Sequence, residues 1–234
     1  MGGASFLWSP HNPLLEQHIL ALARDREGRP AGDPRVCFLP TASADNDAYV
    51  ARFYRAFAGL ECRPTDLRLF ERTVADLESF LLEQDVIYVC GGNTANALAV
   101  WRAHGVDTGL RKAWESGVVL SGWSAGMICW FKESTTDSFN LGQLAPLHDG
   151  LGFIEGSACP HYDGEPERRP LFQRLIGEGS LEDGWAADDG AALVFAGTEL
   201  LEVVSSHPAA TAYRVRRSGD GEVSEQPLPT RYLG

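Results

Sequence analysis

The stretch from Val118 to Trp130, VVLSGWSAGMICW, decides the fold of this chain. An apolar run with strand character ends in GWSAG at residues 122–126, and small and apolar residues that suit a helix follow. A G-x-S-x-G pentapeptide between a strand and a helix is typical of the nucleophile elbow of hydrolases. The pattern therefore predicts that Ser124 lies on a strained turn at the end of a strand, with its hydroxyl exposed.

The residues around Ser124 suit acyl transfer. Glycines at 122 and 126 suggest that a Cβ on either side would crowd the serine. A helix that starts at the turn directs its first backbone N–H groups toward the same place. Ser124 is therefore a candidate nucleophile, and the N–H of Ala125 is a candidate donor to the oxyanion. An ordinary Gly/Ser-rich turn is the alternative, because the pentapeptide is short and common.

Composition narrows the class of protein. A chain of 234 residues, with 44% apolar and 22% charged residues, suits one globular domain, so we expect residues 1–234 to form a single domain. A net charge of −12 argues against nucleic acid or an anionic membrane as a partner, because both need basic patches. Five scattered cysteines suggest buried thiols in a reducing compartment. With no visible secretion signal or membrane-spanning run, we expect a cytoplasmic protein.

The first two-thirds of the chain alternates strands with helices. Strands are expected at Arg35–Leu39, Thr65–Phe70, Asp85–Cys90 and from Val118, and helices at Leu14–Asp25, Asn46–Ala58, Val74–Leu82, Ala95–Ala103 and Thr108–Glu115. Repeated β-α units with short connections predict a mostly parallel sheet with helices on both faces. Beyond Gly184, apolar runs at Leu193–Phe195, Glu199–Ser205 and Ala212–Arg217 around glycine turns predict antiparallel strands near the C-terminus.

A Gly-Gly pair follows the strand at 85–90. The sequence GGNT at residues 91–94 places backbone N–H groups at the carboxyl end of that strand, where open parallel sheets bind ligands. Asn93 or Thr94 would cap the following helix. Capping does not account for two glycines, whereas close approach of a substrate carbonyl does, so we assign Gly92 N–H to the oxyanion hole beside Ala125 N–H.

His161 is the best candidate for the general base that Ser124 needs. It follows a strand-like run at 156–160 and precedes a loop and a helix expected near residues 166–176. A histidine at a strand's carboxyl end faces the same edge as Ser124. His207, in a loop between C-terminal strands, is the competitor. For the carboxylate that orients the histidine, Asp137, Asp188 and Asp189 all remain open.

Four blocks of sequence give the chain a resemblance to a known family. They are YVCGGNT at 88–94, GWSAG at 122–126, TTD at 135–137 and PHY at 160–162. In their order and spacing they resemble the peptidase E (aspartyl dipeptidase) family of serine peptidases, which includes cyanophycinases. The resemblance extends from about residue 38 to about Leu201. It implies a fold similar to class I glutamine amidotransferases, with serine in place of cysteine at the elbow.

The resemblance also implies roles for single residues. Ser124 would be the nucleophile and His161 the base. The family's acid is a glutamate before a glycine, and Asp189 stands in that place, one methylene shorter. Asp137 matches a family aspartate near the site that supports the histidine or the substrate. Asn93, beside the Gly-Gly pair, is a further candidate for substrate binding. No metal or other cofactor is implied.

The chain departs from aspartyl dipeptidases after Tyr162. Those enzymes carry an extended loop there that helps to recognise the N-terminal aspartate of a substrate, whereas here the segment is short. Arg168 or Arg169 could bind a substrate carboxylate in bidentate fashion, or form a solvated helix face beside Glu165 and Glu167. We therefore expect a peptidase of short peptides, dipeptides among them, without strict Asp-Xaa specificity. The oligomeric state is left open.

Two alternatives remain at the level of sequence. An α/β-hydrolase esterase would use its triad in the order Ser124, Asp189, His207, although that fold usually has more chain after the elbow. A binding protein without catalysis on an amidotransferase-like fold is the other. Reaction with a serine-directed phosphonate would separate the binding protein from both enzymes.

Overall fold

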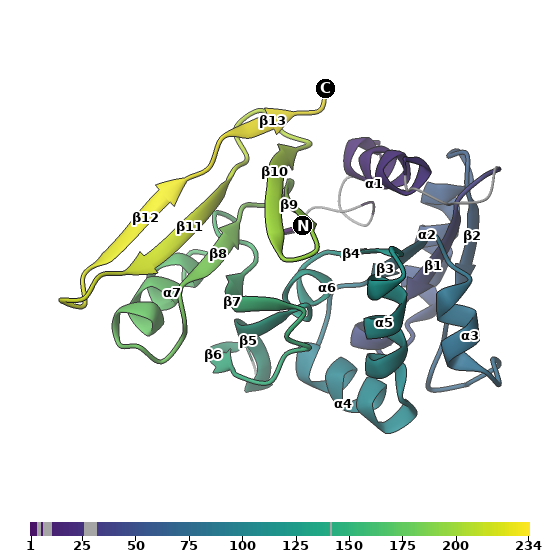
Figure 1. Cartoon of the computed structure of the whole chain (residues 1–234), viewed down its shortest axis with the longest axis horizontal. Coiled ribbons are helices and arrows are strands. Elements are labelled where there is room, and N and C mark those ends of the chain that lie inside the picture. Colours follow the sequence, from purple (N-terminus) through teal and green to yellow (C-terminus); the bar gives the residue numbers. More distant parts are fainter. Residues whose placement is uncertain (4–5, 7–10, 26–31, 141) are drawn as a thin grey trace.

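The chain folds into a mixed α/β structure built on three sheets (Figure 1). This computed structural model describes residues 1–3, 6, 11–25, 32–140 and 142–234. Figure 1 shows the helices α1 to α5 gathered around the strands β1 to β4, and the long hairpin of β11 and β12 at the opposite end of the molecule. Among the described residues, no helix is long and apolar enough to cross a membrane.

The first sheet is entirely parallel, as the β-α pattern predicts. Its strands are β1 (Arg35–Leu39), β2 (Arg63–Asp66), β3 (Val86–Val89) and β4 (Val119–Gly122), in the order β2-β1-β3-β4. All four residues of β3 are buried, which explains why the sequence of this strand is continuously apolar. The carboxyl ends of β3 and β4 therefore lie side by side, and each is followed by one of the glycine motifs.

Helices cover both faces of this sheet. They are α1 (Leu14–Arg24), α2 (Asp47–Phe57), α3 (Leu77–Leu82), α4 (Thr94–His104) and α5 (Val106–Glu115). Tyr88 of β3 donates to Glu16 of α1 (3.1 Å) and packs edge-on against Phe57 of α2, so these two helices share one face. Leu81 of α3 packs on Gly109 of α5, and right-handed connections place this second pair on the other face.

The second sheet is mixed and follows the elbow in sequence. Its strands are β5 (Phe131–Asn140), β6 (Gln143–Leu147), β7 (Ile154–Cys159), β8 (Gly184–Ala187), β11 (Ala212–Arg217) and β12 (Val223–Pro227), in the order β12-β11-β8-β7-β5-β6. β7 runs parallel to β5 and β8, and the outer pairs are antiparallel. The helix α7 (Arg168–Gly177) connects β7 to β8.

The third sheet is small and confirms the antiparallel strands predicted near the C-terminus. It consists of β9 (Ala191–Ala196), β10 (Glu199–Ser205) and β13 (Thr230–Tyr232), in the order β13-β10-β9. β9 and β10 form an antiparallel pair. The loop between β8 and β9 contains Asp188, Asp189 and Gly190.

Several expected elements differ in extent, and α3, for example, begins at Leu77 and not at Val74. The helix after the elbow, α6, covers only Ala125–Ile128, because the carbonyl of Trp130 already accepts from Phe153 and Ile154 and the chain passes into β5. The strand expected at 65–70 ends at Asp66. The Asp45 carboxylate accepts from the N–H groups of Leu69 and Phe70, at 2.6 and 2.9 Å, which removes these donors from the sheet.

An aromatic cluster anchors the elbow to the sheet. Trp123, only 2% exposed, stacks on Phe38 of β1 and contacts Tyr88 of β3. All five cysteines are free thiols, and Cys62 alone among them is not fully buried. Burial raises the pKa of the Cys90 thiol to about 11, so this thiol is neutral and packs as a small apolar side chain.

Candidate active site

Ser124 occupies a strained turn between β4 and α6, as the pentapeptide predicts. Its backbone has φ 54° and ψ −114°, a region that residues with a Cβ rarely adopt. Its carbonyl accepts from Met127 and Ile128 (2.9 and 3.0 Å), so the serine stands at the start of the helix. Such a conformation persists only where surrounding structure enforces it, and it is common at active sites.

The two glycines of the elbow also make room for the neighbouring strand β3. A Cβ on Gly122 would lie 2.5 Å from the carbonyl oxygen of Val89, and one on Gly126 would overlap with the same oxygen. The crowding therefore involves the last carbonyl of β3 and, for Gly122, also the carbonyl oxygen of Gly126 at 2.7 Å. These glycines bring the turn down onto the neighbouring strand.

The Gly91-Gly92 loop lies directly beside the elbow. A Cβ on Gly91 would lie 3.3 Å from the Cβ of Ser124, and Gly92, with φ +137°, would overlap with the carbonyl oxygen of Ala42 if it carried a side chain. The chain's own packing thus requires glycine at both positions, and the approach of a substrate carbonyl to Gly92 stays a prediction. Asn93 caps α4 by accepting from Asn96 N–H (2.8 Å), and its amide donates to Ser138 O (3.0 Å).

Two backbone donors remain available near Ser124. Within the described part of the chain, the N–H groups of Gly92 and Ala125 have no protein acceptor. Ala125 is the first residue of α6, where an N–H has no partner within the helix. An oxyanion formed on a carbonyl attacked by Ser124 would find such donors in this region.

His161 and Asp189 form a hydrogen-bonded pair. His161 follows β7 with a left-handed φ of 51°, and its Nδ1 lies 2.7 Å from Oδ1 of Asp189. Because a carboxylate accepts, Nδ1 carries the proton and Nε2 is left as the proton acceptor. Asp189 is itself held by its backbone N–H, which donates to Asp163 Oδ1 (2.8 Å). Among the described residues, no hydrogen bond joins Ser124 to His161.

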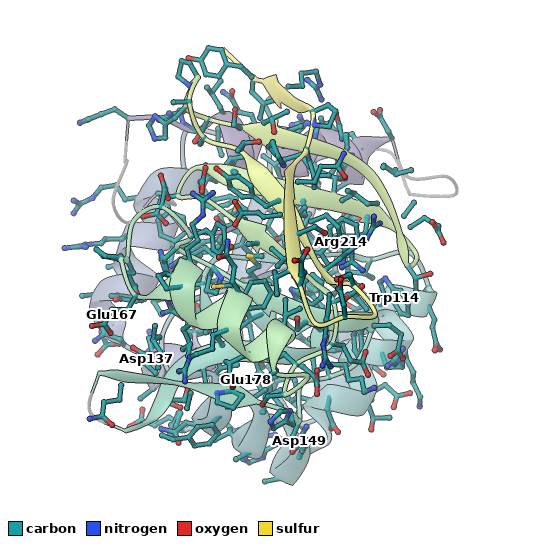
Figure 2. The ribbon with its side chains drawn as sticks, turned by 90° about the vertical axis from the view of Figure 1, so that its left-hand side faces the viewer. Trp114, Asp137, Asp149, Glu167, Glu178 and Arg214 are labelled. Atoms are coloured by element: carbon teal, nitrogen blue, oxygen red, sulfur yellow. The ribbon has the colours of Figure 1, made fainter. Side chains whose placement is uncertain are left out.

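The other two candidate carboxylates lie elsewhere. The carboxylate of Asp188 accepts from Thr211 N–H (3.1 Å) and from the hydroxyl of Tyr213 (3.4 Å). Burial raises the pKa of Asp188 to about 6. Asp137 is exposed on β5 and lines a hollow of about 300 Å³ with Glu165 and Glu167; Figure 2 shows it beside Glu167. Among the described residues, neither Asp188 nor Asp137 forms a hydrogen bond with the imidazole of His161.

Both candidate arginines are held by protein partners. Arg168 is buried, and its guanidinium donates to Glu165 (2.7 Å) and to the carbonyl of Thr135 (3.2 Å). Arg169 pairs with both carboxylate oxygens of Glu225 and lies over the ring of Tyr162. Arg168 is therefore not part of a solvated helix face, whereas Arg169 is exposed on α7, as that expectation allowed.

His207, the competing histidine, is exposed in the loop after β10. Its ring lies beside Gly190, since a Cβ on that glycine would be 2.5 Å from Cδ2 of His207. In the described part of the chain it forms no hydrogen bond with Asp189, whose Oδ1 is already bonded to His161.

Residues 1–3 also lie at the site, which the sequence analysis missed. Ser124 N–H donates to the carbonyl of Met1 (3.2 Å), and Gly190 N–H donates to the carbonyl of Gly3 (3.2 Å). The Gly-Gly pair at residues 2–3 is the one signal that could have drawn attention to this segment, because paired glycines mark close backbone approach.

Comparisons with known proteins identify the family of the chain. The pattern of peptidase family S51 matches residues 1–203. The chain is 50% identical to the uncharacterized peptidase YgaJ of Bacillus subtilis (strain 168), over 100% of this chain and 97% of that protein. It is 32% identical to a peptidase E of Streptomyces coelicolor, over 57% of this chain and 53% of that protein.

A solved structure extends the comparison to the fold. The crystal structure of a peptidase from an acI-B1 Actinobacterium is 19% identical in sequence and matches with a TM-score of 0.70, covering 98% of this chain and 92% of that one. The chain belongs to peptidase family S51 and is a serine peptidase of the peptidase E type.

Proposed function

We propose that this peptidase hydrolyses short peptides, dipeptides among them, through an acyl-enzyme on Ser124. The observation that carries the proposal is the 2.7 Å hydrogen bond between His161 Nδ1 and Asp189 Oδ1, a pair that residues 1–3 connect to the strained elbow. A carboxylate on Nδ1 fixes the tautomer in which Nε2 accepts the serine proton, and it stabilises the imidazolium that results.

In the proposed reaction, Ser124 Oγ attacks the scissile carbonyl carbon while His161 Nε2 takes the hydroxyl proton. The N–H groups of Gly92 and Ala125 donate to the oxyanion. The imidazolium then gives its proton to the leaving amine as the C–N bond breaks. A water molecule, deprotonated by His161, attacks the ester; the acid leaves, and the proton returns to Ser124.

Several features argue against strict specificity for Asp-Xaa substrates. Only the short segment 163–167 separates Tyr162 from α7. The carboxylates of Asp137, Glu165 and Glu167 surround the hollow beside it and would repel an acidic side chain. Arg168 and Arg169 already pair with Glu165 and Glu225.

Five free thiols suit a reducing compartment, and the proposal therefore assigns the enzyme to the cytoplasm.

The test is a library of dipeptides and tripeptides, with release of free amino acids as the readout and Ser124→Ala protein as the control. We expect turnover of several dipeptides and covalent labelling of Ser124 by a serine-directed phosphonate. A folded protein that neither hydrolyses these peptides nor reacts with the phosphonate would be a binding protein. The esterase alternative needs His207 in place of His161, and no observed contact favours it.

A further inference from the structure

Residues 1–3 join the two halves of the candidate site. On one side, the nitrogen of Met1 donates to Gly122 O (3.0 Å) and its carbonyl accepts from Ser124 N–H (3.2 Å). On the other side, Gly2 N–H donates to Ala191 O (3.0 Å) and the carbonyl of Gly3 accepts from Gly190 N–H (3.2 Å). The segment is thus a short main-chain strut between the elbow and the loop that carries Asp189.

Gly3 lies directly against the acid–base pair. A Cβ on Gly3 would overlap with Oδ1 of Asp189 and would lie 2.5 Å from Nδ1 and 2.6 Å from Cε1 of His161. These are the two partners of the His161–Asp189 hydrogen bond. Gly3 does not have a left-handed φ, so the need for glycine arises from space and not from backbone conformation.

The Asp189 carboxylate has glycine on two sides. Gly164 occupies the other one, where a Cβ would overlap with Oδ2. The Asp189 carboxylate therefore fits between the backbones of two glycines, Gly3 and Gly164. The bond from Gly190 N–H to Gly3 O also fixes the backbone next to Asp189, which sets how far this short side chain reaches toward His161.

We propose that Gly3 is a positioning residue, and that the strut of residues 1–3 sets the geometry of the His161–Asp189 pair relative to Ser124. The same strut accepts hydrogen bonds from Ser124 N–H and from the N–H of Gly190, which follows Asp189. A displacement of Ser124 would therefore also displace the loop that carries Asp189, and the reverse. The inference rests on the proposed function in that the pair serves Ser124. Catalytic geometry tolerates little misplacement, since a shift of about 1 Å can cost about 10²-fold in rate.

The test is Gly3→Ala. We expect the added methyl to push the carboxylate and imidazole apart. The downfield proton resonance of the His161 Nδ1–H should disappear, phosphonate labelling of Ser124 should slow at least ~10²-fold, and kcat should fall by a similar factor with little change in KM. Gly59→Ala is the matched control, because Gly59 is exposed and a Cβ there meets no atom within 4 Å.

A double-mutant cycle tests whether Gly3→Ala slows the labelling of Ser124 by displacing the His161–Asp189 pair. In a His161→Ala/Asp189→Ala background there is no pair to displace, so Gly3→Ala should change the residual labelling rate less than threefold. The same background decides the matter if Gly3→Ala alone fails to fold. Recovery of folded protein there supports the proposal, because the clashing side chains are gone, and continued failure overturns it.

The readouts separate this proposal from the proposed function. The proton resonance needs no substrate: its loss in folded Gly3→Ala protein supports positioning even if wild-type protein hydrolyses no peptide. A folded Gly3→Ala protein that keeps the resonance and the wild-type labelling rate would overturn the positioning role, whatever the substrate proves to be.

Discussion

His161 and Asp189 approach each other from two different connections: His161 follows β7, Asp189 precedes β9, and Nδ1 lies 2.7 Å from Oδ1. The backbone of each of these two residues is held by a separate hydrogen bond. Asp189 N–H donates to Asp163, and Glu165 N–H donates to the carbonyl of His161 (3.1 Å). The imidazole is thus oriented by a carboxylate whose own backbone is fixed, which is the arrangement that a general base requires.

The first prediction concerns this carboxylate. Asp189→Asn keeps the size of the side chain but removes the charge that stabilises the imidazolium, so kcat should fall by about 10²- to 10⁴-fold with a small change in KM. Steady-state kinetics on a dipeptide identified in the library screen measure this. Asp188→Asn is the adjacent control and should have a mild effect, because Asp188 bonds to Thr211 and Tyr213.

Asp137→Asn tests the remaining carboxylate. Because Asp137 is exposed on β5, we expect its loss to leave kcat within severalfold of the wild-type value. A severe loss of kcat in Asp137→Asn, with near-normal kcat in Asp189→Asn, would show that Asp137 of β5 is the carboxylate that orients His161.

The second prediction concerns the effect of substituting Ser124 on activity and on stability. Ser124→Ala and Ser124→Gly should both abolish hydrolysis and phosphonate labelling. Because a left-handed conformation costs a residue with a Cβ about 1–3 kcal/mol, Ser124→Gly should raise the free energy of unfolding relative to Ser124→Ala. Thermal unfolding of the three proteins measures the difference. Activity near the wild-type level in either variant would remove Ser124 from the mechanism.

The third prediction compares the two histidines. His161→Ala should lower kcat by about 10³-fold or more, as expected for loss of a triad base. His207→Ala should leave kcat nearly unchanged, because His207 is exposed and Asp189 is bonded to His161. The reverse order of effects would favour an esterase-like triad.

The fourth prediction concerns pH and stability. Burial raises the pKa of Asp188 from its ordinary value of 3.8 to about 6, so between these pH values the folded chain retains a proton that the unfolded chain has lost. This group's contribution to the free energy of unfolding therefore falls as pH rises from about 4 to about 6. Asp188→Asn should gain Tm over wild type across this interval and hold the gain at higher pH. A difference in Tm that is independent of pH would contradict this assignment.

The fifth prediction concerns specificity. We expect cleavage of several dipeptides, with Asp-Xaa substrates no better than neutral ones, because acidic side chains surround the hollow near α7. Competition between Asp-Xaa and Ala-Xaa dipeptides in one reaction gives the ratio of kcat/KM directly. Exclusive turnover of Asp-Xaa would show that another part of the surface supplies a cation for the aspartate.

Much of the fold could be predicted from the sequence because its signals are local. β1, β10 and β11 have the expected bounds, since each is a short apolar or alternating run between turn residues. The elbow is equally local, and Ser124 has the strained backbone that the pentapeptide predicts. The length of α6 was not predictable in this way, because it depends on bonds from Phe153 and Ile154 to Trp130.

The parts of the site that escaped prediction depend on residues distant in sequence. Nothing near Gly3 indicates that Asp189 and His161 will pack against it. The Gly91-Gly92 pair was noticed, but its contacts with Ala42 and Trp123 come from separate segments, so this reason for the two glycines could not be read from the sequence. The sequence therefore shows which residues are unusual more readily than it shows the distant contacts that make them necessary.

The strut of residues 1–3 also has a consequence for biosynthesis. Gly2 pairs with Ala191, so one side of the strut is translated well before the segment that it pairs with. The elbow can form while the chain is still being made, but the acid–base pair cannot be clamped until Ala191 has left the ribosome. Non-local pairing of this kind slows folding. In the proposed mechanism, Ser124 would therefore lack its base during this interval, while unfolded segments of the chain are still nearby.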